Sequence, residues 1–163
     1  MQYKTEEVLS LLEELKIPYK LVTHKVVYTM QEMEAIGVEG IEYVAKNLFV
    51  RDDKKKNYYI VTVQKDKRVD LKTLKNTLNS RSLSLASEED LMHYLALEKG
   101  AVTPLGVLND ANNTVTVVID KDLQNSKYIG MHPNENTASV WLTSKDLERV
   151  IKHTNNAVLY VDL

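Results

Sequence analysis

A single lysine stands inside an apolar, β-branched run of the sequence. The run, YVAKNLFVRD, extends from Tyr43 to Asp52 and places Lys46 and Asn47 near its centre. Such a composition is typical of a strand in a protein core, and alternation would put Lys46 on one face with three aliphatic side chains. The amine then either reaches water at the edge of the sheet or is held as a cation in a site. This segment alone favours the first alternative, so a functional role needs support from residues elsewhere in the chain.

Two loop-like segments carry the other groups that could take part in chemistry. The run GAVTPLGVLND begins at Gly100 and has a Gly-x-x-x-Pro spacing that ends at Pro104. Glycine and proline allow backbone amides to approach a ligand along a preset path, although a helix C-cap followed by a turn explains the same residues. The run HPNENTAS, from His132 to Ser139, concentrates imidazole, amide, carboxylate and hydroxyl groups. Its ordinary explanation is a polar turn.

Several common catalytic and ligand-binding patterns are absent from the sequence. There is no cysteine, which excludes a thiol nucleophile, a disulfide and a thiolate zinc site. Neither a Gly-x-Ser-x-Gly elbow nor a glycine-rich phosphate loop ending in Lys-Ser or Lys-Thr occurs. The four histidines lie far apart and form no ligand pair at helical spacing. We therefore predict no metal site and no cofactor.

Length and composition are those of a soluble globular protein. We expect residues 1–163 to form one domain, because a chain of this length can bury a core unaided. The hydrophobic share of 44% and the charged share of 27% are ordinary. No apolar run approaches membrane-spanning length and no signal core is present, so we predict no membrane partner and a cytoplasmic location. The net charge of −2 argues against a protein that coats DNA, but it allows a local basic patch to bind one RNA end.

The elements that must position these groups follow from hydrophobic periodicity and capping signals. Strands are expected at residues 19–23, 43–52, 58–64, 82–86, 114–119, 128–131, 138–142 and 157–161. Helices are expected at about 5–16, 29–37, 70–79, 87–100, 121–126 and 143–153. Thr29 and Glu32 have the spacing of a capping box, and the lysine triplet 54–56 would form a hairpin tip or, alternatively, a phosphate contact. This order predicts an α/β domain with a mixed, curved sheet of six or seven strands packed by helices.

Taken together, these motifs resemble the YbaK-like aminoacyl-tRNA deacylase family. The resemblance is carried by Lys46-Asn47 in a strand, the Gly100-to-Pro104 loop with Asn109-Asp110, and His132-Pro133 followed by Asn136-Thr137. The family includes the editing domain inserted in bacterial prolyl-tRNA synthetases and freestanding prolyl-tRNA editing proteins. The length of this chain fits a freestanding member, and its loops look closest to those of the alanine-specific editors.

By this resemblance, the substrate is a tRNA that carries the wrong amino acid, and the reaction hydrolyses its ester to the terminal ribose. Lys46 would be the essential catalytic amine, Asn47 would form hydrogen bonds beside it, and His132 would help to place the aminoacyl group. The other substrate-binding residues that the resemblance implies are Gly100, Ala101, Val102, Thr103, Pro104, Asn136 and Thr137. An activated ester needs positioning and oxyanion stabilisation more than a strong nucleophile, and the neighbouring ribose hydroxyl would help to activate water.

Specificity would come from the size of the pocket. A small apolar pocket with Met30, Met33 and Phe49 as candidate walls would admit alanine and exclude proline, although each of the three is also a plausible core residue. The sequence thus predicts a trans-editing hydrolase for Ala-tRNA(Pro). Its partners would be the acceptor end of proline tRNA and either prolyl-tRNA synthetase or an elongation factor. The alternatives are a deacylase for cysteine or serine on tRNA, and a non-catalytic module that binds an aminoacyl-tRNA or an RNA end.

Overall fold

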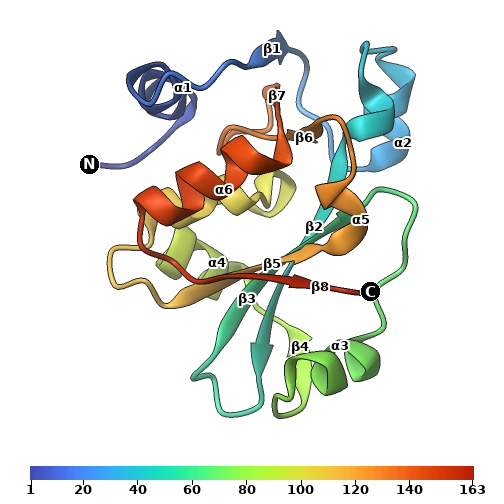
Figure 1. Cartoon of the computed structure of the whole chain (residues 1–163), viewed down its shortest axis with the longest axis vertical. Coiled ribbons are helices and arrows are strands. Elements are labelled where there is room, and N and C mark those ends of the chain that lie inside the picture. Colours follow the sequence, from blue (N-terminus) through green and yellow to red (C-terminus); the bar gives the residue numbers. More distant parts are fainter.

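The computed structural model describes residues 1–163 as two β-sheets surrounded by helices (Figure 1). The strands are β1 (Lys20–Thr23), β2 (Ala45–Asp52), β3 (Tyr58–Gln64), β4 (Leu83–Leu85), β5 (Val115–Asp120), β6 (Ile129–Met131), β7 (Ala138–Leu142) and β8 (Val158–Val161). The α-helices are α1 (Thr5–Glu14), α2 (Met30–Ala35), α3 (Leu71–Leu78), α4 (Glu88–Leu95), α5 (Lys121–Gln124) and α6 (Ser144–His153). The 3-10 helices are η1 (Ile41–Tyr43), η2 (Lys99–Ala101) and η3 (Pro104–Asn109). None of the helices combines the length and the apolar character needed to cross a membrane.

The larger sheet has five strands in the order β4-β2-β3-β5-β8. β2 and β3 form the antiparallel hairpin expected from the sequence, with Asn47 opposite Thr62. β5 runs parallel to both β3 and β8, so the α/β class and the mixed strand pairing are confirmed. β4 pairs with β2 only from Val50 to Asp52. The edge of β2 beside Lys46 therefore has no paired strand.

The smaller sheet has the order β1-β7-β6, and its strand pairs are antiparallel. It meets the larger sheet through one parallel bridge between Val44 and Gly130. A Cβ at Gly130 would lie 2.8 Å from Trp141 Nε1 and 2.9 Å from Val44 Cγ2, so this close approach requires glycine. The sequence predicted one curved sheet of six or seven strands. The strands are instead divided between two sheets, because this connection is limited to a single residue pair.

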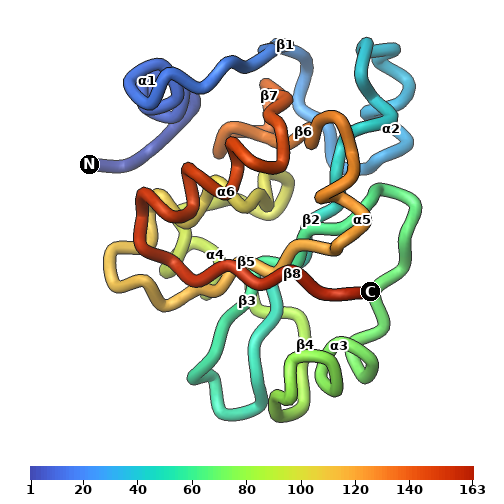
Figure 2. The backbone as a smooth tube through the Cα atoms, viewed as in Figure 1, coloured from blue at the N-terminus to red at the C-terminus, as the bar shows by residue number.

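The main hydrophobic core lies on one face of the larger sheet, where residues of α1, α4 and α6 pack against both sheets. The other face packs against α3 in a second cluster that contains Val50 and Leu74. Figure 2 shows α6 and α3 on opposite sides of the β5–β8 pair. Because successive strand residues point to opposite faces, Phe49 enters the main core and Val50 enters the second cluster. Each fully buried aliphatic side chain contributes about 1.5–3 kcal/mol to folding.

A third cluster supports α2 beside the start of β2. Its buried members are Val27, Met33, Val38, Val44 and Trp141. The hydroxyl of Thr29 accepts a hydrogen bond from the Glu32 N–H at 3.0 Å, which confirms the first half of the predicted capping box. The Glu32 carboxylate accepts instead from the backbone N–H of Tyr28, at 3.1 Å. Glu32 therefore fixes the segment that leads into α2.

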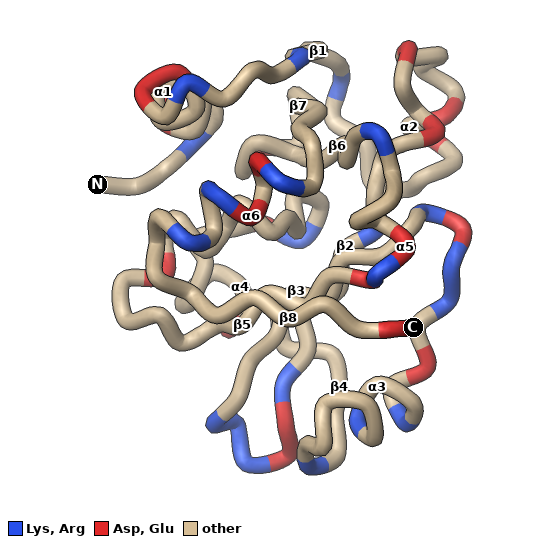
Figure 3. The backbone as a smooth tube through the Cα atoms, in the orientation of Figure 1, with Lys and Arg blue, Asp and Glu red and all other residues tan.

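Two further expectations can be compared with the structure. The helix expected over 87–100 ends at Leu95, because Ala96 adopts a left-handed conformation with φ of 53°, and Gly100 lies in η2. The lysine triplet 54–56 lies in the exposed turn between β2 and β3, as the hairpin-tip interpretation predicted (Figure 3). In this turn the Asp52 carboxylate accepts a hydrogen bond from the Lys56 N–H at 2.9 Å.

Candidate active site

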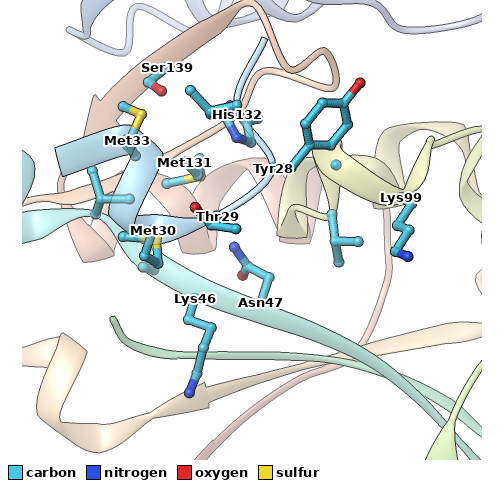
Figure 4. Close-up of a pocket in the computed structure, with 15 residues that line it drawn as sticks. Tyr28, Thr29, Met30, Met33, Lys46, Asn47, Lys99, Met131, His132 and Ser139 are labelled. Carbon is cyan, nitrogen blue, oxygen red and sulfur yellow. The ribbon is translucent and has the colours of Figure 1, made fainter. Parts of the chain in front are cut away.

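A cavity of about 180 Å³ opens between α2, the start of β2, η2 and the segment that joins β6 to β7 (Figure 4). The predicted site residues that line it are Met30, Met33, Lys46, Asn47, Gly100, Val102 and His132. Its other lining residues are Val27, Tyr28, Thr29, Val44, Ala45, Lys99, Met131 and Ser139. Four segments that are far apart in the sequence thus meet around one small cavity.

His132 presents a neutral imidazole to this cavity. Its Nδ1 lies 2.7 Å from the carbonyl oxygen of Ala138, and a carbonyl only accepts, so Nδ1 carries the proton and donates. Burial lowers the pKa of His132 below its ordinary value, an effect that His24 reinforces and that the Ala138 carbonyl partly opposes. Nε2 is therefore left as a hydrogen-bond acceptor at neutral pH.

A second histidine, His24, lies beside His132 and was not assigned a role from the sequence. The two ring centroids are 5.8 Å apart. His24 Nδ1 lies 2.8 Å from the Lys25 carbonyl oxygen, and its Nε2 lies 2.9 Å from Ser139 Oγ. The hydroxyl of Ser139 is thus held by an oriented imidazole. The signal for this pair is weak in the sequence, because 115 positions separate the two residues.

Lys46 and Asn47 leave β2 in opposite directions, as strand alternation requires. Asn47 Oδ1 accepts a hydrogen bond from Thr62 Oγ1 at 2.6 Å, which leaves the amide nitrogen free to donate into the cavity. The Lys46 ammonium donates to the carbonyl oxygen of Lys67, on the far side of the strand. Figure 4 shows Asn47 turned towards the cavity and the Lys46 amine turned away from it. The structure therefore places Lys46 at the border of the cavity, with its amine outside.

The Gly100-to-Pro104 loop contributes two residues to the cavity wall. Gly100 and Val102 line the cavity, and neither of their backbone N–H groups finds an acceptor within the chain. The N–H of Ala101 is occupied, since it donates to the Glu98 carbonyl at 2.9 Å. A pair of unoccupied amides beside a cavity is suited to an oxyanion or a polarised carbonyl.

Thr103 and Pro104 do not line the cavity, and the substrate-binding role that the resemblance implies for them stays a prediction. The buried Thr103 hydroxyl caps η3 by accepting from the Leu105 N–H at 3.3 Å, and Pro104 occupies the first turn of that helix. Phe49 is a core residue, not a pocket wall, because it points to the main core and stacks on Tyr58 at a centroid distance of 5.5 Å.

Asn136 and Thr137 hold the segment before α2 and do not line this cavity either. The Asn136 side chain accepts from the Val27 N–H at 3.2 Å and donates to the Val27 carbonyl. The Thr137 carbonyl accepts from the His24 N–H at 2.9 Å. Together with Ala101, both residues line a neighbouring cavity. Their contribution to the first cavity is therefore indirect.

The wall of the cavity on the side of α2 is apolar. Met30 and Met33 come from α2 and Met131 comes from the end of β6 (Figure 4). Thioether side chains are apolar and adaptable, so they suit a small aliphatic group. The cavity thus combines an apolar wall, an imidazole acceptor, a carboxamide donor and two backbone donors. This set can hold a small acyl group by its carbonyl while water has access from the open side.

Comparisons with known proteins identify relatives over almost the entire chain. The family model of the aminoacyl-tRNA editing domain matches residues 24–150. The chain is 46% identical over 158 residues to the prolyl-tRNA editing protein ProX of Acetoanaerobium sticklandii, covering 97% of this chain and 96% of that protein. It is 33% identical over 155 residues to the prolyl-tRNA synthetase associated domain-containing protein 1 of Danio rerio, covering 93% of this chain and 83% of that protein.

A solved structure shares the fold. The crystal structure of a candidate trans-editing enzyme for prolyl tRNA synthetase superimposes with a TM-score of 0.72, over 98% of this chain and 96% of that chain. The sequence identity is 21%, so this similarity concerns the arrangement of the elements.

Proposed function

Because the chain belongs to the aminoacyl-tRNA editing domain family, we propose that it hydrolyses the ester between alanine and the terminal ribose of proline tRNA. The observation that best supports this proposal is the small cavity that neutral His132 lines together with an apolar wall and with Gly100 and Val102, whose backbone N–H groups have no acceptor in the chain. An aminoacyl ester offers matching groups: a carbonyl, an ammonium group and a small side chain. The proposed activity is that of an aminoacyl-tRNA deacylase acting in trans, in the cytoplasm.

In the proposed reaction, a water molecule attacks the ester carbonyl and the bond to the ribose oxygen breaks. The N–H groups of Gly100 and Val102 donate to the carbonyl oxygen as it gains negative charge. His132 Nε2 accepts a hydrogen bond from the alanine ammonium group and fixes its orientation. The neighbouring ribose hydroxyl takes part in activating the water, and the proton ends on the departing ribose oxygen. No covalent enzyme intermediate is required.

Lys46 has to change its conformation to take part in this reaction. In the free protein its ammonium is bound to the Lys67 carbonyl. The adjacent edge of β2 carries no paired strand, so a flexible lysine side chain can reach around it when a phosphate group arrives. We propose that Lys46 then binds the phosphate of the terminal nucleotide, while Asn47 donates to the ribose.

Selectivity for alanine over serine is supported by the polarity of the cavity wall. A cavity of about 150 Å³ holds a benzene ring, so 180 Å³ admits an alanyl group easily, and the volume alone does not exclude proline. Of the hydroxyls that line the cavity, that of Thr29 caps α2 and that of Ser139 is bonded to His24. A serine side chain would have to share these groups or compete for Asn47 and His132, which favours alanine over serine. Exclusion of proline would be steric and would depend on the shape of the apolar wall.

The acceptor end of proline tRNA is the proposed partner, and prolyl-tRNA synthetase or an elongation factor would deliver or receive that tRNA. The direct experiment supplies the protein with alanyl-, seryl-, cysteinyl- and prolyl-tRNA(Pro) and follows release of the amino acid. We expect fast release of alanine, slower release of serine and cysteine, and no release of proline. Hydrolysis of none of the four would refute the proposed function. Tight binding of uncharged tRNA without hydrolysis would then support a non-catalytic RNA-end binding module.

A further inference from the structure

A second cavity of about 320 Å³ adjoins the first, and Tyr28 and Gly100 line both. Its wall is formed by the N-terminal segment around Tyr3, by the β6–β7 loop at Asn136 and by Glu98 before η2. The volume is roughly twice that of a cavity that holds a benzene ring. A planar, substituted ring therefore fits beside a group bound in the first cavity.

Tyr28 separates the two cavities, and its side chain is exposed while its backbone is held. Its side chain is 74% exposed, the highest value among the nine tyrosines. Its backbone N–H is bonded to Glu32, and the preceding residue Val27 is held on both sides by Asn136. The ring lies over Gly100, where a Cβ would come within 3.4 Å of Tyr28 Cδ1. Figure 4 shows the ring at the rim of the first cavity, with its hydroxyl pointing outward.

The second cavity also offers apolar surface and an unpaired carboxylate. Val26 and Met92 line it and are exposed by 47% and 48%. Glu98 lines it as well and forms no ion pair or side-chain hydrogen bond within the protein. A nucleobase has matching surfaces, because its faces are apolar and stack on aromatic rings while its edge carries polar groups. A carboxylate accepts from an exocyclic amine such as that of cytosine or adenine, and it repels a phosphate.

We infer that Tyr28 is the stacking surface for one unpaired nucleobase, and that Glu98 accepts a hydrogen bond from the exocyclic amine of that base. This inference rests on the proposed function, because an ester bound in the first cavity places the terminal nucleotide of an RNA next to the second. The bases at the 3′ end of a tRNA are cytosines and an adenine, and each carries such an amine. Tyr28 is then a positioning residue and the second cavity is a nucleobase subsite.

The first test measures binding without hydrolysis. Adenosine 5′-monophosphate, purine riboside 5′-monophosphate and ribose 5-phosphate are titrated into the protein, and the NMR signals of the tyrosine rings are followed. We expect Tyr28→Ala to weaken the binding of adenosine monophosphate roughly 5–150-fold. Tyr28→Phe should bind it with the affinity of the wild-type protein. Glu98→Ala should remove the preference for adenosine over purine riboside. Tyr128→Ala is the matched control, since Tyr128 is exposed outside both cavities. Equal affinity of the wild-type protein for ribose 5-phosphate and adenosine monophosphate would overturn the inference.

The second test separates this inference from the proposed function. The alanyl esters of adenosine and of methyl riboside are compared as substrates of the wild-type protein and Tyr28→Ala. We expect Tyr28→Ala to raise KM for the adenosine ester more than KM for the methyl riboside ester, with little change in kcat. If Tyr28→Ala hydrolyses both esters with the KM values of the wild type, the nucleobase subsite is refuted and the proposed function is supported. Binding of adenosine monophosphate that depends on Tyr28, without hydrolysis of either ester, would refute the function and support the subsite.

Discussion

Gly100 lies so close to Asn136 that a Cβ at Gly100 would overlap the Asn136 amide nitrogen. The same amide group holds both the N–H and the carbonyl of Val27. The loop that carries the candidate oxyanion donors is therefore fitted directly against the segment that leads into α2. A displacement of either element has to disturb the other.

The substitution Gly100→Ala tests this relationship. The added methyl group has to displace Asn136, which releases Val27 and moves the walls of both cavities. We expect kcat/KM for alanyl-tRNA(Pro) to fall by about 10–100-fold, because small misplacements near a reacting group have effects of this size. The thermal unfolding midpoint should fall only modestly, since the hydrogen bonds between Asn136 and Val27 are lost while the main core stays intact. Measurement of deacylation rates together with circular dichroism melting distinguishes these two effects.

A double-mutant cycle with Asn136→Ala provides the control for that experiment. Once the Asn136 amide is removed, the methyl group of Gly100→Ala no longer meets it. The loss caused by Gly100→Ala should therefore be much smaller in the Asn136→Ala protein than in the wild type. Additive losses in the double variant would show that the two residues act independently, contrary to this interpretation.

The lowered pKa of His132 predicts how activity and stability depend on pH. Activity should persist below the ordinary histidine pKa of about 6.5 and fall only as the imidazole is protonated at its lowered pKa. Between the two pKa values the unfolded chain binds more protons than the folded one. The free energy of unfolding therefore rises with pH through this interval. The stability that neutral His132 contributes is lost as the pH falls through its lowered pKa.

The variant His132→Gln tests both parts of the pH prediction, because glutamine does not titrate. Urea unfolding of the wild type and the variant at about pH 5 and pH 7.5 should show a smaller pH dependence in the variant. The acid limb of the deacylation profile should also shift or disappear. An unchanged acid limb would show that a group other than His132 controls it.

Much of the scaffold was predictable from the sequence because it rests on local signals. The β2–β3 hairpin follows from two β-branched runs around a polar turn, and the start of α2 follows from Thr29 and Glu32. The division into two sheets was not predictable, because it depends on one bridge between Val44 and Gly130, 86 positions apart. Local patterns carry no information about such a contact.

The candidate site was predictable in its segments but not in its side-chain directions. The motifs identified Lys46, Gly100 and His132, and in the structure these three residues line one cavity. They could not show that Asn136 would bind a backbone segment instead of facing that cavity, since this depends on Val27. They also could not show that the Lys46 amine is directed to Lys67, because the loop after β3 had no sequence signal of its own.

The variant Lys46→Ala tests whether the lysine enters the site during the reaction. We expect kcat/KM for alanyl-tRNA(Pro) to fall by at least about 100-fold, because a charged contact to the substrate is lost. The control is Lys65→Ala, which removes a neighbouring half-buried lysine whose ion pair with Glu34 lies outside the cavity. That control should alter activity only slightly. Wild-type activity of Lys46→Ala would show that the amine takes no part in the reaction.

The pair formed by Ser139 and His24 allows a different chemical route to be tested. Ser139 Oγ lies 2.9 Å from His24 Nε2, and the Lys25 carbonyl orients the other ring nitrogen. This arrangement resembles an activated nucleophile, which would form an acyl-enzyme by attacking the ester. However, Ser139 is only 2% exposed and belongs to β7, so a covalent intermediate would have to form within a packed strand.

We therefore expect Ser139→Ala to retain deacylation within about tenfold of the wild type, because the variant removes only a hydrogen bond that orients His24. The unfolding free energy should fall by about 0.5–1.5 kcal/mol for the same reason. Loss of a true serine nucleophile would reduce kcat by roughly 10⁶-fold, which separates the two routes clearly. Single-turnover deacylation followed by mass spectrometry provides the second measurement. An alanyl group attached to Ser139 would contradict direct attack by water, whereas its absence in an active enzyme supports the substrate-assisted route.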